Sequence, residues 1–286
     1  MSDVQASPAA LAAPAGRRMK TGTAEACIGA ALILGWLLAA VGAAFLAPYD
    51  PNGLDLMAVL APPGEAHWFG TDNLGRDVLS RVIYGARIDI WMGFVGVIIP
   101  LIIGVGIGLI SGYFGGLTDT VLMRLVDVTV AFPFFILVIA IVGVLGPGLA
   151  NYFVALALVS WVAYARLVRA EVLVVRRLEY IQAARAMGFS NGVILMRHVL
   201  PNVLGSITIY AWTDAVMVLL AGASLGFLGL GAQPPTAEWG VMIADGQPYI
   251  VQAWWICFFP GLAMVTLSLG FILVSDGLAR RLRVSA

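Results

Sequence analysis

Long uninterrupted apolar runs dominate the chain. A helix needs roughly 20 consecutive apolar residues to cross the hydrocarbon core of a bilayer. Runs that reach or approach this length lie at about residues 26–47, 90–111, 126–146, 152–173, 203–230 and 253–275. Strands of a transmembrane barrel would show short alternating segments instead, and these runs are continuous. The pattern therefore predicts an all-α integral membrane protein with six transmembrane helices.

Two features modify individual runs. The fourth run is weaker than the others because Arg166 and Arg169 enter its C-terminal end, where long basic side chains can reach the membrane interface. Pro100 and Pro133 lie inside the second and third runs and are expected to kink those helices.

Polar and charged positions are scarce. The chain is 61% hydrophobic and only 11% charged, whereas soluble domains are nearer ~25% charged. The formal net charge is zero, which argues against a nucleic-acid partner. Composition thus supports a membrane protein and offers nothing for DNA or RNA.

The N-terminus differs from the rest. Residues 1–16 are rich in Ala and Pro, and a basic cluster follows them. The first apolar run then exceeds the ~7–15 residues of a signal-peptide core. We therefore expect a disordered cytoplasmic tail at residues 1–24 and one uncleaved transmembrane domain over residues 25–286.

Basic residues set the expected orientation, because Lys and Arg accumulate on the cytoplasmic side. With the N-terminus inside, every Lys and Arg falls inside except Arg76, Arg81 and Arg87, which lie in the 48–89 segment. This predicts an N-in, C-in topology. The polar stretch 179–202, between the fourth and fifth runs, is then cytoplasmic.

This stretch, "EYIQAARAMGFSNGVILMRHVLPN", has the pattern of two short helices joined by a turn. Gly188 suits a left-handed helix end, Ser190 or Asn191 can cap the second helix, and Pro201 can start the fifth span. Helical spacing puts four residues on one face of the first helix: Glu179, Gln182, Ala183 and Ala186. From pattern alone, a partner-binding face and an ordinary solvated loop both remain open.

The same stretch resembles the EAA loop of bacterial ABC-importer permeases, in which a coupling helix docks on an ATP-hydrolysing subunit. Glu179, Ala183, Ala184 and Gly188 match its E-x-x-x-A-A-x-x-x-G core, and His198, Leu200, Pro201 and Asn202 match its closing segment. The resemblance implies that Glu179 is a polar contact to the ATPase and that Gly188 forms the turn after the helix.

A second segment, "HWFGTDNLGRDVLSRVIYGARIDI" at residues 67–90, resembles the signature of the dipeptide, oligopeptide and nickel permease group. The matching residues are Gly70, Thr71, Asp72, Gly75, Arg76, Asp77 and Arg81. Similarity to the second permease of dipeptide importers extends over roughly residues 25–280, although Asp89 stands where the group usually has serine. Physically, residues 67–90 read as an amphipathic outer helix with an Asp77–Arg81 pair. An external gate or binding-protein dock and a charged structural brace are both compatible with it.

The resemblance implies a multi-pass permease subunit of the bacterial cytoplasmic (inner) membrane that imports di- and oligopeptides. The implied partners are a homologous permease forming a heterodimer, two ATP-binding subunits and a periplasmic or lipid-anchored solute-binding protein. No cofactor is implied. Nickel and glutathione remain alternative cargoes.

Catalysis by this chain is not expected. A phosphate-binding P-loop needs a lysine, and the only lysine is Lys20. "GASLG" at 222–226 fits a nucleophile-elbow pattern, so an intramembrane hydrolase or acyltransferase is the rival of another class, and a passive channel is a second rival. The serine lies within an apolar run, however, and His67 and His198 are expected on opposite sides of the membrane. Close helix packing explains this motif better, and also explains the glycines at 104–108.

Two acids within apolar runs are functional candidates, because ionisable groups are costly inside a membrane. Asp127 is expected at a cytoplasmic helix edge, in a capping or interface role. Asp214 is expected to face either the transport pathway or an internal hydrogen-bond partner.

Overall fold

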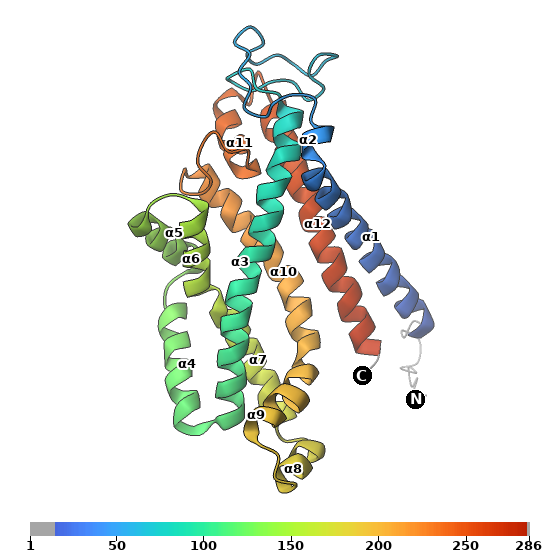
Figure 1. Ribbon diagram of the computed structural model, residues 1–286, viewed down its shortest axis with the longest axis vertical. Coiled ribbons are helices and arrows are strands. Elements are labelled where there is room, and N and C mark those ends of the chain that lie inside the picture. Colours follow the sequence, from blue (N-terminus) through green and yellow to red (C-terminus); the bar gives the residue numbers. More distant parts are fainter. Residues whose placement is uncertain (1–14, 285–286) are drawn as a thin grey trace, which may run out of the picture.

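A computed structural model describes residues 15–284 of the chain, which form an elongated helical bundle (Figure 1). The α-helices, in chain order, are α1 (Ala15–Val41), α2 (Ala43–Leu46), α3 (Val78–Phe114), α4 (Gly116–Val130), α5 (Phe134–Leu145), α6 (Leu149–Val159), α7 (Trp161–Val175), α8 (Glu179–Ala186), α9 (Asn191–Val193), α10 (Leu200–Phe227), α11 (Trp239–Gly246) and α12 (Trp255–Val284). Within the described residues, Thr71 and Asp77 form an isolated bridge and no strand is present. The predicted all-α class is confirmed.

Five helical segments are long and apolar enough to cross a membrane. They are Gly22–Val41, Val78–Phe114, Leu149–Val175, Asn191–Phe227 and Trp255–Leu282. A sixth span is present if α4 and α5, which meet at 83°, count as one broken span. Helix α1 begins at Ala15, within the 1–24 range where a tail was expected, and residues 1–14 lie outside the described residues.

The third span differs most from its prediction. The helix starts at Gly116 rather than near residue 126, and it does not kink at Pro133 but ends before it. Pro133 is the N-cap of α5, a position where its missing N–H costs nothing. Asp127 therefore lies in the last turn of α4, beside the break. Pro100, by contrast, lies inside the uninterrupted α3.

The fifth span also begins earlier than expected. The predicted second short helix runs from Asn191 through a π-helical segment, Ile194–Val199, directly into α10. Pro201 falls in the first turn of α10 but does not start the span. A π turn rearranges the hydrogen-bond ladder locally, and the helix continues through it without a sharp turn.

Glycine contacts hold the central helices together. A Cβ added at Gly104 would overlap the carbonyl of Trp161, and one at Gly108 would lie 2.7 Å from the carbonyl of Ala165. Helices α3 and α7 therefore approach closely along this stripe, as the close-packing interpretation predicted. Within the 222–226 motif, a Cβ at Gly222 would lie 2.9 Å from Met92, so this segment also serves packing.

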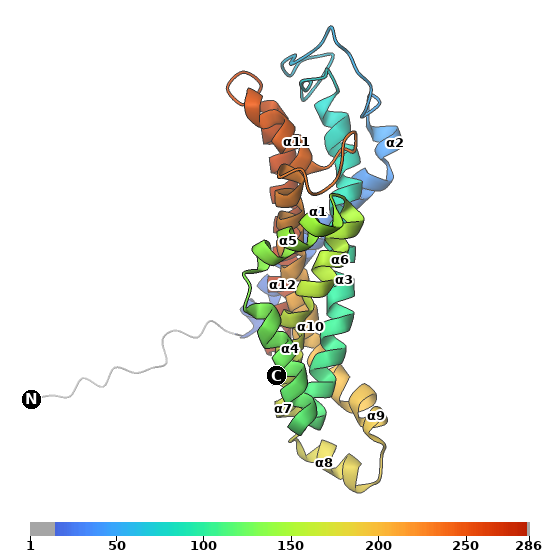
Figure 2. The same ribbon diagram turned by 90° about the vertical axis from the view of Figure 1, so that its left-hand side faces the viewer.

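The two polar segments lie at opposite ends of the long axis. The segment connecting α2 to α3 and the short α11 crowd one end, whereas α8 and α9 form the other (Figures 1 and 2). Helix α3 alone spans 37 residues, about 55 Å at 1.5 Å per residue. It thus exceeds the ~30 Å hydrocarbon core and connects both ends.

Candidate functional site

Helix α8 forms the tip of the molecule and presents the face expected from its spacing. Glu179, Gln182, Ala183 and Ala186 are exposed. Ala184 is buried together with Ile181, so this motif alanine packs inward and is withdrawn from any partner. The exposed face of α8 therefore carries polar and small side chains, and its buried face is apolar, with Ile181 and Ala184.

Gly188 ends the helix in the left-handed conformation. Its φ is +80°, and no atom of the described residues lies within 4 Å of an added Cβ. The N–H of Phe189 donates to the carbonyl of Ala184 at 3.2 Å, which closes the helix end. Ser190 then caps the next helix, accepting from the N–H of Val193 at 3.4 Å. The predicted glycine stop and the serine cap are both confirmed.

Side-chain bonds fix this tip to the ends of α3 and α7. Tyr113, on the last turn of α3, donates its hydroxyl to Asn191 at 2.9 Å. The guanidinium of Arg185 lies 4.7 Å from the centre of the Tyr113 ring. Arg176 donates to the carbonyl of Gly112 at 2.8 Å. The tip is therefore coupled mechanically to the two central helices.

The closing motif residues lie behind this tip. His198 is half-buried with its ring 6.2 Å from that of Phe189, and its carbonyl accepts from Asn202 Nδ2 at 2.6 Å. Pro201 and Asn202 are exposed. These residues shape the return of the chain into α10.

The tip also exposes apolar side chains that the sequence reasoning missed. Met187 is 70% exposed and Met196 63%, with Tyr180, Phe189 and Val193 exposed beside them. Methionine and aromatic residues are enriched in protein interfaces. These exposed apolar side chains lie on α8, on α9 and on the segments that join them to α10.

The opposite end holds a buried charge network. Arg76 Nε donates to Asp72 Oδ2 at 2.6 Å, and its Nη2 lies 3.3 Å from Asp245 Oδ2. Arg81, 1% exposed, lies 3.7 Å from Asp72 and donates to the carbonyl of Pro51 at 3.0 Å. These charges are paired inside the fold and are not displayed on its surface.

The predicted amphipathic helix over 67–90 is wrong in its first part. Helix α3 begins only at Val78, and Asp77 is its N-cap, accepting from the backbone N–H of Ser80 at 2.8 Å. The other Asp77 oxygen contacts His67 Nδ1 at 2.9 Å. Asp77 therefore does not pair with Arg81 as predicted, because capping uses its carboxylate.

The remaining signature residues shape the loop before α3. Gly70 and Gly75 have φ of +72° and +74°, and a Cβ at Gly75 would collide with the backbone of Asp55. The carbonyl of Thr71 accepts from Trp255 Nε1 at 3.0 Å, which ties the loop to α12. The geometry is that of a structural brace.

Asp89 and Glu238 form a second buried acidic contact, 149 positions apart in the chain. Asp89 Oδ2 accepts from the N–H of Trp239 at 3.2 Å. Glu238 caps α11, accepting from the N–H groups of Gly240 and Val241 at 2.7 and 2.8 Å. Burial raises the pKa of the Glu238 carboxyl above its ordinary value. No local pattern pointed to Glu238, because its partner Asp89 lies on a distant helix.

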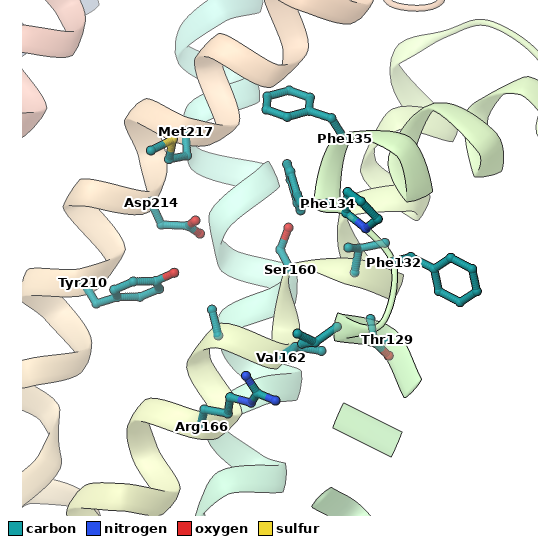
Figure 3. Close-up of a pocket in the computed structure, with 14 residues that line it drawn as sticks. Thr129, Phe132, Phe134, Phe135, Ser160, Val162, Arg166, Tyr210, Asp214 and Met217 are labelled. Atoms are coloured by element: carbon teal, nitrogen blue, oxygen red, sulfur yellow. The ribbon is translucent and has the colours of Figure 1, made fainter. Parts of the chain in front are cut away.

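A cavity of about 690 Å³ opens beside the breaks between α4 and α5 and between α6 and α7 (Figure 3). Asp214 from α10 and Arg166 from α7 are the charged side chains in its lining, with aromatic and aliphatic residues around them. Asp214 Oδ2 accepts from the hydroxyl of Tyr164 at 2.8 Å. The sequence left two roles open for Asp214, and the structure gives it both an internal hydrogen bond and a place on a cavity wall.

Ion pairs join α4 to α7 next to this cavity. Arg169 donates to both oxygens of Asp119, with Nη2 2.6 Å from Oδ2, so its charge is paired within the bundle. Arg166 Nη2 lies 3.4 Å from Asp127 Oδ1 in a more exposed pair. Asp127 thus has the role of an ion-pair partner and does not cap a helix.

Comparisons with known proteins agree with this arrangement. The family described as "Binding-protein-dependent transport system inner membrane component" matches residues 104–284. The dipeptide transport system permease protein DppC of Alkalihalophilus pseudofirmus is 42% identical over 88% of this chain and 83% of its own length. The glutathione transport system permease protein GsiD of Pectobacterium atrosepticum is 44% identical over 82% of this chain and 79% of its own.

Among solved structures, a chain of the MetNI methionine ABC transporter in inward-facing conformations aligns with a TM-score of 0.57 and 21% identity. The alignment covers 72% of this chain and 96% of that chain. This likeness concerns the fold.

Proposed function

Since this chain belongs to the family of binding-protein-dependent transport system inner membrane components, we propose that the cargo it conducts is short peptides. The chain is the membrane-spanning permease component, and ATP hydrolysis belongs to a separate subunit. The single observation that carries the peptide assignment is the 42% identity to a dipeptide permease over nearly the whole chain.

The proposed orientation places α8 and α9 in the cytoplasm and the 48–77 segment outside, with both chain ends inside. The two segments occupy opposite ends of a bundle whose helices exceed the thickness of a bilayer. The basic residues gather toward the α8 end, as the positive-inside rule requires.

Helix α8 is proposed to be the coupling helix that docks on an ATP-hydrolysing subunit. Its exposed face carries Glu179, which can pair with a basic partner residue, and Ala183, which permits close backbone approach. Around it, exposed Met187 and Phe189 supply apolar contact area. Two such ATPase subunits, one under each of two homologous permeases, complete the proposed assembly.

The base of the tip explains how force could pass inward. The buried residues Ile181 and Ala184 pack in one cluster with residues of α3 and α7. Arg185 of α8 contacts the Tyr113 ring of α3, and Gln182 of α8 donates to the carbonyl of Arg176 at the end of α7. A displacement of α8 by a closing ATPase is therefore expected to move α3 and α7, and α7 lines the cavity. Such coupling between sites is typically worth ~1–3 kcal/mol, and it acts only if the two states differ in contact energy.

The outer segment is proposed to receive a periplasmic or lipid-anchored solute-binding protein. Its buried charges, those of Asp72, Arg76 and Arg81, are paired with one another, so docking would use other side chains. Leu56, Met57 and Trp68 are exposed there, Met57 at 97%. An exposed apolar group on a rigidly braced loop is suited to a protein contact.

Glutathione is a second candidate cargo. The relative GsiD, named a glutathione transport system permease protein, is 44% identical. Glutathione is itself a tripeptide with a free amino group, so both candidates share a chemical class.

One experiment tests the proposal. The chain carrying an affinity tag is purified from bacterial membranes in mild detergent, the associated proteins are identified, and the complex is reconstituted for uptake of trialanine. Co-purification of a nucleotide-binding subunit and a second permease, with ATP-dependent trialanine uptake, is expected. A chain that purifies alone, or a complex that leaves trialanine outside while accumulating nickel, would overturn the peptide assignment.

A further inference from the structure

The cavity of Figure 3 combines size, position and charge in a way that packing does not require. Its volume of about 690 Å³ lies within the ~300–1,000 Å³ of small-molecule pockets. It lies beside the break between α4 and α5 at Pro133 and beside Ser160, the residue between α6 and α7. Most of its wall is apolar, supplied by residues such as Phe134, Val162 and Met217.

Against that apolar wall stand one acid and one base. In Figure 3, Asp214 projects from α10 on one side and Arg166 projects from α7 on another, and Ser160 also lines the cavity. Asp214 and Arg166 do not form an ion pair with each other. Asp214 accepts a hydrogen bond from Tyr164, and Arg166 contacts Asp127. The cavity therefore presents two separated opposite charges to whatever enters it.

The bonding of Asp214 leaves it able to bind a cation. The hydrogen bond from Tyr164 engages Oδ2, and Oδ1 has no protein donor among the described residues. Tyr164 is fully buried and orients the carboxylate. A charge held by such a bond in an apolar, low-dielectric site interacts strongly with a ligand of opposite sign.

Arg166 is the complementary group. Its side chain is half exposed, and its contact with Asp127 is long at 3.4 Å. Such an exposed pair contributes little, so a ligand carboxylate can replace Asp127 on the guanidinium at small cost. Arginine suits this role because its planar fork binds carboxylates with two parallel bonds.

From these observations we infer that the cavity is a binding site for the two charged ends of a zwitterionic short peptide. Asp214 takes the α-ammonium group, Arg166 takes the carboxylate, and the aromatic wall accepts side chains without selecting among them. An extended di- or tripeptide spans about 7–10 Å, which a cavity of this volume accommodates. The inference rests on the proposed function as a peptide permease and names the residues that recognise the peptide backbone.

The test measures occupancy of the cavity directly, without delivery by a binding protein. Met217, on the cavity wall, becomes a reporter as Met217→Cys in a complete transporter whose Cys27 and Cys257 are replaced by Ala. The transporter in lipid nanodiscs, with its ATPase subunits but no solute-binding protein, reacts with a maleimide. The reaction rate is compared with and without millimolar trialanine, and with and without N-acetyl-trialanine.

Trialanine is expected to protect Met217→Cys in the parent transporter. Asp214→Asn should weaken that protection roughly tenfold in trialanine concentration, the effect of losing one charged hydrogen bond. Asp214→Glu should restore most of it. Glu65→Gln removes an acid from the exposed outer segment and should leave protection unchanged. N-acetyl-trialanine, which lacks the ammonium, should protect the parent as weakly as trialanine protects Asp214→Asn.

Arg166→Gln tests the other end of the ligand. Protection by trialanine should be weaker in this variant than in the parent. In the variant, trialanine and trialanine amide, which lacks the carboxylate, should protect equally. Absence of protection in the parent, or equal protection in the parent and in Asp214→Asn, would overturn the inference.

Failure of the inference is distinguishable from failure of the proposed function. The same preparation, supplied with its binding protein and ATP, is assayed for trialanine uptake. Uptake without protection would leave a peptide permease whose cavity does not bind the peptide ends. Absence of uptake would contradict the proposed function itself.

Discussion

The turn at Gly188 allows the coupling proposal to be tested by backbone strain alone. Its φ of +80° lies in the left-handed region, and no atom of the described residues is within 4 Å of an added Cβ. Substitution by valine therefore adds no clash. The cost is that of forcing a β-branched residue into the left-handed region, about 1–2 kcal/mol.

That cost is comparable with the coupling itself. A penalty of 1–2 kcal/mol changes an equilibrium between turn conformations by about 5- to 30-fold, and coupling between sites is typically ~1–3 kcal/mol. We therefore expect Gly188→Val to reduce ATP-driven peptide uptake by about that factor. The bundle should stay folded, because the turn lies at its tip and an added Cβ meets open space.

Asparagine supplies the matched control, because Asn tolerates the left-handed conformation far better than valine does. Gly188→Asn adds a side chain of similar size in the same open space and should retain most of the uptake. The assay is ATP-dependent trialanine uptake into membrane vesicles, normalised to the amount of permease in the membrane. Equal loss in Gly188→Asn and Gly188→Val would refute the strain argument and indicate that any side chain there obstructs docking. Full uptake by a well-inserted Gly188→Val would refute the role of the turn.

Three further outcomes are expected. Glu179→Lys should insert normally but lose most ATP-driven uptake, because it reverses the charge of the docking face. Glu65→Lys, at the exposed opposite end, should keep normal uptake. Equal uptake by the two variants would count against docking through Glu179. Gly104→Val should lower the free energy of unfolding by about 1–3 kcal/mol, as overpacking does. Gly106→Val meets open space and should leave the free energy of unfolding unchanged. Thermal melts in detergent compare the two variants, and a Gly104→Val variant as stable as the parent would contradict the close α3–α7 contact. Burial raises the pKa of Glu238 above its ordinary 4.5, so the folded state holds a proton that the unfolded chain releases: this stabilisation is complete below pH 4.5 and is lost as pH rises through the raised pKa. Glu238→Gln should therefore flatten the decline of Tm with pH, and an unchanged decline would show that another group causes it.

The long helices could be predicted because an apolar run is a local property. The third span shows the limit of that reasoning. Its first turns, from Gly116, carry Asp119 and Arg124, which lowered the apparent hydrophobicity and moved the predicted start toward residue 126. Asp119 is neutralised by Arg169 on α7, 50 positions away, a pairing that no local window can contain.

The prediction of a helix through the first part of residues 67–90 was wrong for a related reason. Helical spacing between Asp77 and Arg81 suggested a pair, but a helix N-terminus requires a cap, and Asp77 provides it. The two positive-φ glycines, Gly70 and Gly75, then rule out a helix through the preceding residues. The contacts of these motif residues with α11 and α12 join distant parts of the chain, so the local pattern could not reveal them.

At the tip and at the cavity, too, some features could be predicted from the sequence and others could not. The polar face of α8 and the Gly188 stop followed from spacing and residue type. The exposed apolar rim around Met187 did not, because an apolar residue in a membrane protein gives no sign of facing water. The cavity lies between α10 and the junctions α4–α5 and α6–α7, so of its lining residues only Asp214 stood out in the sequence as a functional candidate.

The central claim is that an ATPase grips the α8 end of this permease. The most direct measurement places a single cysteine at Ala183, exposed on α8, and another, in a separate variant, at Glu65 on the opposite end. Each complete transporter in membranes is treated with a short bifunctional thiol reagent. We expect Ala183→Cys to cross-link to the nucleotide-binding subunit and Glu65→Cys to leave it free. Cross-linking of that subunit through Glu65→Cys, or labelling of Ala183→Cys by an impermeant reagent from outside intact cells, would contradict the account.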